Sequence, residues 1–327
     1  MIATTLVRLR ARRVAGAIAA MALASVGLSV GAAAQDTVQI GLATKTWFPS
    51  IIARATDEQG FFEDEGIKAE LTIYQSGAES FTAMVAGAAD LISTSSSVTA
   101  AGQEKGIDSK LFVIAGSGNY GWQLVVPPDS DIKDPDQLDG KKVGITSAGS
   151  LSDMLARWTK KEYGVEFEAI PLGGGGLAPN LISGNVDAVV IYSPLSFQVI
   201  DEGNGVSILD YGTAMPEHLN SGWGALKSNM DDNPELFAKT ARALLKGVAY
   251  LQDNKDAAVK MISEVNQVPP SVAEKEWANV FEKLSRTGEG DEKKADVAIE
   301  LAKLAGIENA PAASEIWTDK FVTDNAQ

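Results

Sequence analysis

The sequence predicts an α/β protein made of two similar lobes, each a mostly parallel sheet flanked by helices. Two observations support this fold class. Strand and helix patterns alternate from Val38 to Ala115, which is the rhythm of a parallel sheet covered by helices. In addition, one loop–helix–turn–strand unit occurs twice, at Gly77–Asp90 and again at Gly174–Asp187. A unit that recurs once in each half indicates two related lobes.

The two copies share the same spacing of glycine and aspartate. In each, a second glycine stands ten residues after the first and opens a Gly-x-x-Asp turn, at Gly87 and at Gly184. A short helical pattern precedes the turn, and an apolar run follows it. The repeat therefore predicts equivalent strands after Asp90 and after Asp187.

The chain begins with a segment typical of an export signal. Arginines gather within residues 8–13, a weakly apolar run spans Val14–Val30, and Ala32–Ala34 precedes the first acidic residue. This order of charged, apolar and small residues predicts a secretory signal peptide at residues 1–34, cut after Ala34. A transmembrane anchor is the alternative, but the run is short and rich in Ala and Gly.

Composition excludes several classes of function. The 327 residues carry 28 basic and 43 acidic side chains, a net charge of −15, and removal of residues 1–34 with their four arginines makes it −19. Such a surface repels nucleic acid. The chain has no cysteine, so neither disulfides nor a lipid-anchored start is expected, and the exported protein should be freely soluble.

Strands in the first half end at polar loops. The predicted strands are Val38–Leu42, Ala69–Tyr74, Leu91–Ile92 and Leu111–Ala115, with helical patterns between them. Ligands of such sheets lie beyond the carboxyl ends of the strands. The polar residues that follow these ends are expected at 44–49, at Ser76 and Gly77, and at 93–97.

The stretch Ser93–Ser97 has five consecutive hydroxyl residues, and a helical pattern starts at Val98. A buried strand that ends in serines and begins a helix brings hydroxyls and free backbone N–H groups to one point. That arrangement suits an anionic or strongly polar ligand.

The second half repeats the arrangement. Lys141–Ile145 is predicted as a strand that ends in a hydroxyl-rich turn, after which Ser150 caps a helix. Further strands are expected at Glu166–Ile170 and Val186–Tyr192. Ser221–Leu226 is interpreted as a crossover returning to the first lobe. From Asn233 and Pro234 onward the patterns are helical and core-facing, and none is a cofactor motif.

Two formal motif matches fail on context. Residues 116–121 fit GxGxxG, but a strand pattern rather than a helix follows, so a crossover between lobes fits better than a dinucleotide site. Residues 130–133 fit SxxK, yet they lie in a proline-flanked loop instead of on a helix.

Several segments together carry a family resemblance: 60–67 (GFFEDEGI), Gly77-Ala78, 86–90 (AGAAD), 138–144 (LDGKKVG) and 184–189 (GNVDAV). With them the chain resembles the periplasmic substrate-binding proteins of ABC importers, in particular the group that serves sulfonates, taurine, nitrate and thiamine-pyrimidine precursors. The resemblance covers nearly all of the chain after residue 34, but its motifs are turns and fold glycines that do not specify a ligand.

The resemblance implies a type II periplasmic binding protein fold. Lobe one would comprise residues 35–120 plus 224–327, lobe two residues 121–223, and two hinge crossovers would join them. A small solute would bind in the cleft between the lobes, and hinge closure would present the closed form to the permease subunits in the membrane. A monomer in the periplasm is expected, with no cofactor and no metal.

Candidate ligand-binding residues are those in the predicted cleft loops and crossovers: Lys45, Thr46, Trp47, Phe48, Ser76, Gly77, Ser95, Ser96, Ser97, Asn119, Tyr120, Ser147, Gly149, Ser150, Gly174, Tyr192 and Trp223. The serines could equally be ordinary helix caps, and the aromatic residues could be core packing. Lys45 is the one cation predicted in a cleft loop of lobe one. The lone His218 is expected to be an exposed loop residue, since it has no partners for a metal site or a triad.

The expected function is capture of a small polar or anionic organic solute, such as a sulfonate, taurine or nitrate, and its delivery to an ABC permease. A pyrimidine or thiamine precursor, or an aromatic acid, is the alternative ligand. An enzyme resembling the pyrimidine synthase of the same fold family is disfavoured, because that chemistry relies on cysteine and histidine. A subunit that presents its ligand to a sensor is a further alternative.

Overall fold

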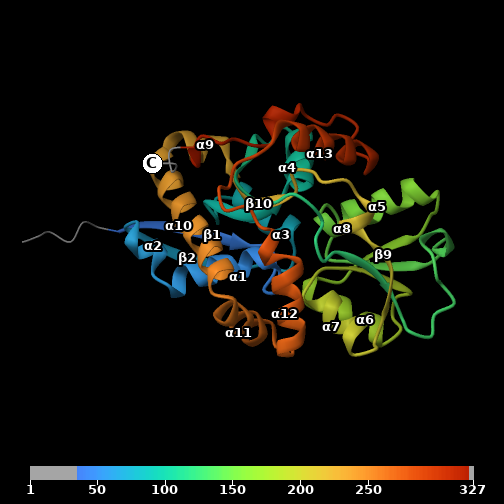
Figure 1. The fold of residues 1–327 in the computed structure, drawn as a ribbon. Helices are drawn as coiled ribbons and strands as arrows, with labels where there is room; N and C mark the ends of the chain where they lie inside the picture. Colours follow the sequence, from blue (N-terminus) through green and yellow to red (C-terminus); the bar gives the residue numbers. More distant parts are fainter. Residues whose placement is uncertain (1–34, 324–327) are drawn as a thin grey trace, which may run out of the picture. The chain divides into compact units, whose positions relative to one another are not determined.

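The computed structural model describes residues 35–323, and the predicted export signal at residues 1–34 lies outside this range. Within it the chain forms two five-stranded sheets, each flanked by helices (Figure 1). The predicted α/β fold class is therefore confirmed. None of the described helices combines the length and the apolar character needed to cross a membrane.

The first sheet has the order β2-β1-β3-β10-β4. Its strands are β1 (Asp36–Leu42), β2 (Ile67–Ile73), β3 (Leu91–Ser95), β4 (Ser109–Gly116) and β10 (Ser221–Leu226). The strand β10 pairs antiparallel with both β3 and β4, whereas β1 pairs parallel with β2 and β3. Four strands thus run in one direction, as the sequence predicted.

The second sheet repeats this plan in the order β7-β6-β8-β5-β9. Its strands are β5 (Gln123–Val126), β6 (Lys142–Ile145), β7 (Glu168–Pro171), β8 (Ala188–Ile191) and β9 (Val206–Asp210). Here β5 is the antiparallel strand, between β8 and β9. Each sheet therefore takes its reversed strand from the segment that has just crossed over from the other sheet.

Helices cover both sheets. Those following first-sheet strands are α1 (Phe48–Glu58), α2 (Phe61–Asp64), α3 (Gly77–Val85), α4 (Ser96–Glu104) and α9 (Lys227–Asp232). The second sheet carries α5 (Leu151–Tyr163), α6 (Leu177–Ile182), α7 (Leu195–Asp201) and α8 (Tyr211–Ala214). The C-terminal helices are α10 (Pro234–Asp253), α11 (Lys255–Asn266), α12 (Pro270–Asn279) and α13 (Glu292–Leu304). Short 3-10 turns are η1 (Pro135–Gln137), η2 (Gly174–Gly176), η3 (Phe281–Lys283) and η4 (Ala313–Glu315).

The repeated Gly-x-x-Asp unit has the same structure in both lobes. Gly87 and Gly184 adopt the left-handed backbone conformation, with φ of 77° and 69°, which glycine adopts without a steric penalty. The following aspartates, Asp90 and Asp187, each accept a 2.8 Å hydrogen bond from a backbone N–H of the neighbouring strand. The repeat thus aligns β3 against β1 and β8 against β6, and the prediction of equivalent strands is confirmed.

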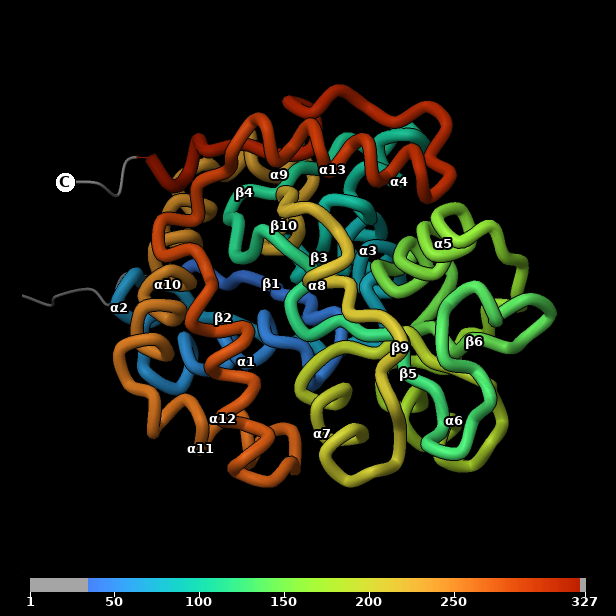
Figure 2. The backbone as a smooth tube through the Cα atoms, turned by 45° about the vertical axis from the view of Figure 1, so that its right-hand side comes forward, coloured from blue at the N-terminus to red at the C-terminus, as the bar shows by residue number. Residues whose placement is uncertain are grey.

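Two crossovers connect the sheets, one between β4 and β5 and one between α8 and β10 (Figure 2). They lie side by side, because the N–H groups of His218 and Asn220 donate to carbonyls of Ser117 and Gly116 at 3.0 and 3.1 Å. The interpretation of Ser221–Leu226 as the returning crossover was wrong: this segment is the strand β10, inside the first sheet. Residues 215–220 make the return instead.

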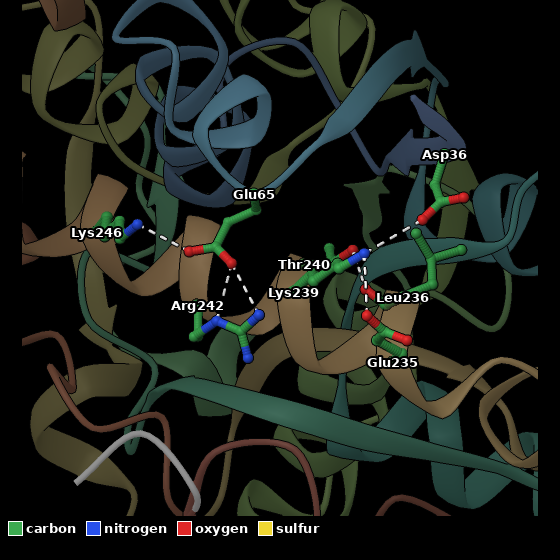
Figure 3. A network of polar contacts seen from close by, with 8 residues as sticks. All are labelled: Asp36, Glu65, Glu235, Leu236, Lys239, Thr240, Arg242 and Lys246. Carbon is green, nitrogen blue, oxygen red and sulfur yellow. Dashed lines mark hydrogen bonds and ion pairs between the residues drawn. The ribbon is translucent and has the colours of Figure 1, made fainter. Parts of the chain in front are cut away.

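A charged cluster fastens the C-terminal helix α10 to the first sheet (Figure 3). Glu65, in the turn between α2 and β2, accepts from Arg242 and Lys246, each at 2.8 Å. Partial burial raises the pKa of Glu65, but the hydrogen bonds and charges of Arg242 and Lys246 outweigh burial and lower it below its usual value. Within the segment 60–67, Glu65 therefore serves this packing.

Candidate functional site

A cavity of about 30 Å³ lies between the two lobes. Both lobes contribute to its wall: Ala43, Thr44, Trp47, Gly77, Thr94, Ser95 and Val98 from the first, and Trp122, Thr146, Ser150, Leu151 and Tyr192 from the first crossover and the second lobe. That volume holds about two water molecules. The lobes are thus nearly closed on each other, and access for a solute requires them to part.

Four helices begin at this cavity. The wall includes the N-cap residues Trp47 of α1, Ser95 of α4 and Ser150 of α5, together with Gly77, the first residue of α3. The first turn of a helix has N–H groups without an intrahelical partner, and the helix dipole makes that end positive. Four such ends around one cavity create a site for an anion or a strongly polar group.

The serines at these helix starts are true caps. The side chains of Ser76, Ser95 and Ser150 each accept a hydrogen bond from the N–H three residues further on. This capping holds the helix ends in place and leaves the N–H groups of the first positions directed outward. The two interpretations of the serines are therefore compatible for Ser95 and Ser150, which cap a helix and also line the cavity.

One hydroxyl in the wall is left without a partner. Thr94 is only 2% exposed, and its Oγ1 forms no hydrogen bond with the described residues. Leaving a buried hydroxyl unpaired costs about 1–3 kcal/mol. A ligand that hydrogen-bonds to Thr94 would recover this energy.

The second lobe presents hydroxyls that are already paired with one another. Thr146, Ser150 and Ser152 form a triangle of side-chain hydrogen bonds between 2.8 and 2.9 Å long. Ser152 also accepts from the N–H of Thr146 at 2.8 Å. This side of the cavity is preorganised, because its polar groups need no ligand to be satisfied.

Tyr192 joins the lobes across the cavity. Its hydroxyl lies 2.9 Å from the hydroxyl of Thr46, on the opposite lobe. Burial raises the pKa of Tyr192 above its usual value, against the lowering effect of hydrogen bonds from Thr44 and Thr46, so the phenol is neutral. Its ring also lies against Trp122, with centroids 5.2 Å apart. These aromatic groups and Trp47 give the cavity flat apolar walls beside its polar helix ends.

The glycine loop at Gly173–Gly176 closes over the same junction. The N–H of Gly174 donates to the carbonyl of Gln75 in the other lobe at 2.9 Å. A Cβ at Gly174 would stand 2.6 Å from the Tyr192 hydroxyl and 2.9 Å from Cγ2 of Thr44. Only glycine allows the lobes to approach this closely.

Amide side chains join the two crossovers, and His218 lies beside them. The expectation that His218 is an exposed loop residue was wrong. His218 is 5% exposed. Its Nδ1 lies 2.8 Å from the Pro216 carbonyl, which can only accept, so Nδ1 carries the proton and Nε2 accepts from Asn220 at 2.9 Å. Asn220 also donates to Asn119 at 2.6 Å. Burial lowers the pKa of His218, although the bond to Pro216 opposes this, and the imidazole is therefore neutral near pH 7.

The structure brings only part of the predicted site to the cavity. Five of the predicted residues line it, namely Trp47, Gly77, Ser95, Ser150 and Tyr192, while Thr46 and Gly174 bridge the lobes beside it. Ser96, Ser97 and Asn119 line a second small cavity at the hinge. Ser76, Ser147 and Gly149 lie on outer grooves between the lobes.

Four predicted residues lie away from both small cavities. Phe48 packs edge-on against Phe281 of η3. Tyr120 lies under the ammonium of Lys283, 4.8 Å from the ring centroid. Trp223 is fully buried inside the first sheet, as its place in β10 requires. Lys45 is exposed and does not line the cavity.

Sequence reasoning missed Thr44, Thr94, Trp122, Thr146 and Leu151, all in the cavity wall. Each is adjacent or nearly adjacent to a residue that was named. Thr94 stands within the hydroxyl run itself, and strand alternation alone does not tell which side chains of β3 face the cleft. No Asp, Glu, Lys, Arg or His lines this cavity, and the described residues contain no cluster of acidic and histidine side chains that could hold a metal ion.

Two solved structures with the same architecture are binding proteins for sulfonate and nitrate. The alkanesulfonate-binding protein SsuA from Xanthomonas axonopodis pv. citri, bound to MOPS, matches with a TM-score of 0.75 and 16% identity, covering 87% of this chain and 99% of that one. The periplasmic nitrate-binding protein NrtA from Synechocystis PCC 6803 matches with a TM-score of 0.71 and 16% identity, covering 89% and 88%. The fold is that of this class.

The family follows from the sequence. The family model described as NMT1/THI5 like matches residues 49–258, and the chain belongs to that family. A Bacillus subtilis (strain 168) protein, provisionally named an aliphatic sulfonates-binding protein, is 26% identical over 245 residues, 72% of each chain. The formylaminopyrimidine-binding protein of Halalkalibacterium halodurans is 23% identical over 241 residues, 70% of each chain.

Proposed function

We propose that this protein is an extracytoplasmic solute-binding protein that captures a small organic or inorganic anion between its lobes and delivers it to an ABC permease. One observation carries the proposal: four helix N-termini and an unpaired buried hydroxyl meet in a single interlobe cavity. Relatives and structural neighbours named for sulfonates and nitrate support an anion of this kind.

The absence of cations from the cavity wall defines how the anion would be held. Backbone N–H groups and hydroxyls, rather than a bidentate arginine, would bind its oxygens. Lobe two, with its paired hydroxyls, would offer a fixed surface. Lobe one would add the bond to Thr94 when the cleft closes.

The proposal also covers the cellular location, the partners and the binding of the solute without chemical conversion. A signal peptide cut after Ala34 would send the protein to the periplasm as a monomer, where its closed form would meet the permease subunits. Capture without chemical conversion is supported by the wall, in which no Cys, His, Lys or carboxylate offers a nucleophile or a base.

A pyrimidine or a related flat heterocycle is the second candidate ligand. The tryptophans Trp47 and Trp122 favour it, since both rings line the cavity and can stack on a planar ligand. The formylaminopyrimidine-binding relative supports the same alternative.

A thermal-shift screen tests the proposal. Methanesulfonate, nitrate, benzoate and a formylaminopyrimidine would each be titrated, with sodium chloride at equal ionic strength as the control. We expect the melting temperature to rise with one of the anions and that anion to be recovered unchanged. Stabilisation by the pyrimidine alone would favour the second candidate, conversion of a ligand would make the protein an enzyme, and stabilisation by none would overturn the proposal.

A further inference from the structure

Two hydroxyl pairs in this protein have the same chemistry and a different placement. In each pair a tyrosine hydroxyl lies within hydrogen-bond distance of a threonine hydroxyl. Tyr211 and Thr159, 2.7 Å apart, both belong to lobe two, on α8 and α5. Tyr192 and Thr46 are 2.9 Å apart, but Tyr192 follows β8 of lobe two and Thr46 precedes α1 of lobe one. Of the two pairs, the one with Tyr192 therefore joins the lobes.

The hydroxyl of Tyr192 is enclosed by groups of the opposite lobe and by the glycine loop. It hydrogen-bonds with the hydroxyls of Thr44 and Thr46, both in lobe one. A Cβ at Gly174 would stand only 2.6 Å from it, and Tyr192 as a whole is 2% exposed. A hydrogen bond in such a dry place is stronger than the same bond in water. Parting of the lobes would break both bonds of this hydroxyl.

Other contacts hold each partner on its own lobe. The Tyr192 ring lies against Trp122, at the start of lobe two, with centroids 5.2 Å apart. Thr46 directly precedes Trp47, the N-cap of α1, whose N–H donates to the Thr44 hydroxyl at 3.3 Å. The bond between Tyr192 and Thr46 thus fixes the loop that begins α1 against lobe two. Since α1 supplies one of the helix ends at the cavity, this bond also positions that end.

We propose that Tyr192 is a positioning residue for solute capture, and that its hydrogen bond with Thr46 is a latch that sets how long the closed form holds its solute. This inference rests on the function proposed above and specifies how release is controlled. A solute enters when the lobes are apart and the two hydroxyls are not in contact, so the association rate constant kon does not depend on them. Release requires the latch to open, so the dissociation rate constant koff does.

Stopped-flow measurement of kon and koff tests the latch, with Trp47 and Trp122 of the cavity wall as fluorescent reporters. The probe is the compound that raises the melting temperature in the screen, whether methanesulfonate, nitrate, benzoate or the formylaminopyrimidine. We expect Thr46→Val to raise koff about fivefold, as the loss of one hydrogen bond predicts, and to leave kon within twofold. Thr46→Ser keeps the hydroxyl and should keep the wild-type koff. Thr46 does not line the cavity, so this effect would not come from a lost solute contact.

A matched pair of tyrosine variants separates the latch from a general loss of packing. Tyr192→Phe and Tyr211→Phe each remove one buried phenol hydroxyl that is bonded to a threonine. We expect Tyr192→Phe to raise koff at least fivefold. Tyr211→Phe should lower the melting temperature and leave koff within twofold. Equal koff values for the two variants would overturn the inference, and Thr46→Val carries the test if Tyr192→Phe does not fold.

The double variant Thr46→Val/Tyr192→Phe shows whether the two hydroxyls act on each other. Because both changes remove the same bond, the combined increase in koff should be clearly smaller than the product of the two single increases. A combined increase equal to that product would mean that Tyr192 acts on the solute independently of Thr46, and it would overturn the latch.

The outcomes also separate this inference from the proposed function. If one of the four compounds binds and Thr46→Val has the wild-type koff, solute binding stands and the latch is wrong. If none of the four compounds binds, the proposed function fails, and the inference fails with it.

Discussion

The two lobes share their framework and differ at the cleft. In both, an aspartate after a left-handed glycine fixes the neighbouring strand, and the registers of β1 with β3 and of β6 with β8 correspond residue for residue. At the cleft the likeness is only partial: Ser95 and Ser150 each cap a helix and line the cavity, but other residues differ. Lobe one begins α1 at Trp47, without a side-chain cap, and leaves Thr94 unpaired, whereas lobe two begins α5 at a capping serine within a closed hydroxyl triangle. The framework is thus repeated, and under the proposed function ligand recognition would depend on the residues that are not.

The C-terminal helix α12 places a buried carboxylate close to lobe two. Helix α12 buries Glu276 at 1% exposure, close to Ser193 of lobe two. Burial raises the pKa of Glu276 to about 8, and the Ser193 hydroxyl opposes this without forming a hydrogen bond of good geometry. The folded protein therefore holds a proton between pH 4.5 and 8 that the unfolded chain releases.

The largest expected effect is on the pH dependence of stability. In the wild type the free energy of unfolding should fall by about 1.4 kcal/mol per pH unit from pH 4.5 to 8 because of this group. Glu276→Gln should remove that slope and exceed wild-type stability by roughly 4 kcal/mol at pH 8. Urea unfolding at several pH values measures it, with the exposed Glu274→Gln on the same helix as control. Equal slopes in wild type and Glu276→Gln would contradict the assignment.

The next largest expected effect is a loss of ligand affinity when closure of the lobes is blocked. Gly174→Val places atoms against Tyr192 and Thr44 across the cleft, whereas a Cβ at the neighbouring Gly175 meets nothing within 4 Å. We expect Gly174→Val to weaken ligand binding about a hundredfold, since overpacking costs about 1–3 kcal/mol. Gly175→Val should bind as the wild type does. Calorimetric titration with the ligand from the screen measures both, and similar affinities would show that the lobes need not approach this closely.

Removal of the unpaired hydroxyl of Thr94 in lobe one is expected to change ligand affinity about tenfold. Thr94→Val should raise the free energy of unfolding by about 1 kcal/mol, because it removes a buried unsatisfied group, and weaken ligand binding about tenfold. Thr240→Val is the control, since its buried hydroxyl already donates to Leu236 at 2.8 Å. The control should lose stability and keep its affinity. If Thr94→Val left binding unchanged, Thr94 would not contact the ligand.

The smallest expected effect is a loss of stability when the turn shared by the two lobes is altered. Asp90→Ala and Asp187→Ala each remove one hydrogen bond that a strand N–H donates to a half-buried carboxylate. Each should lower the free energy of unfolding by about 1 kcal/mol, with no change in ligand affinity. Chemical denaturation compares them directly. Markedly unequal losses would show that the two turns are alike in geometry only.

Sequence alone predicted the framework better than the site. The Gly-x-x-Asp repeat and the caps Ser95 and Ser150 were predictable because turns and helix starts depend on residues close in the chain. The cavity wall was not, since Trp122 and Leu151 meet Thr44 and Thr94 only through the packing of one lobe on the other. His218 was predicted as exposed because its burial depends on the two crossovers lying side by side, where its partner Asn220 also donates to Asn119 of the other crossover.

Amide NMR tests the central claim most directly. The claim is that helix starts from both lobes hold one anion. On titration with methanesulfonate or nitrate, the N–H resonances of Gly77, Ser97 and Leu151 should shift together, at the same anion concentration, in both lobes. Shifts confined to one lobe, or limited to exposed basic residues such as Arg157 and Lys161, would contradict it.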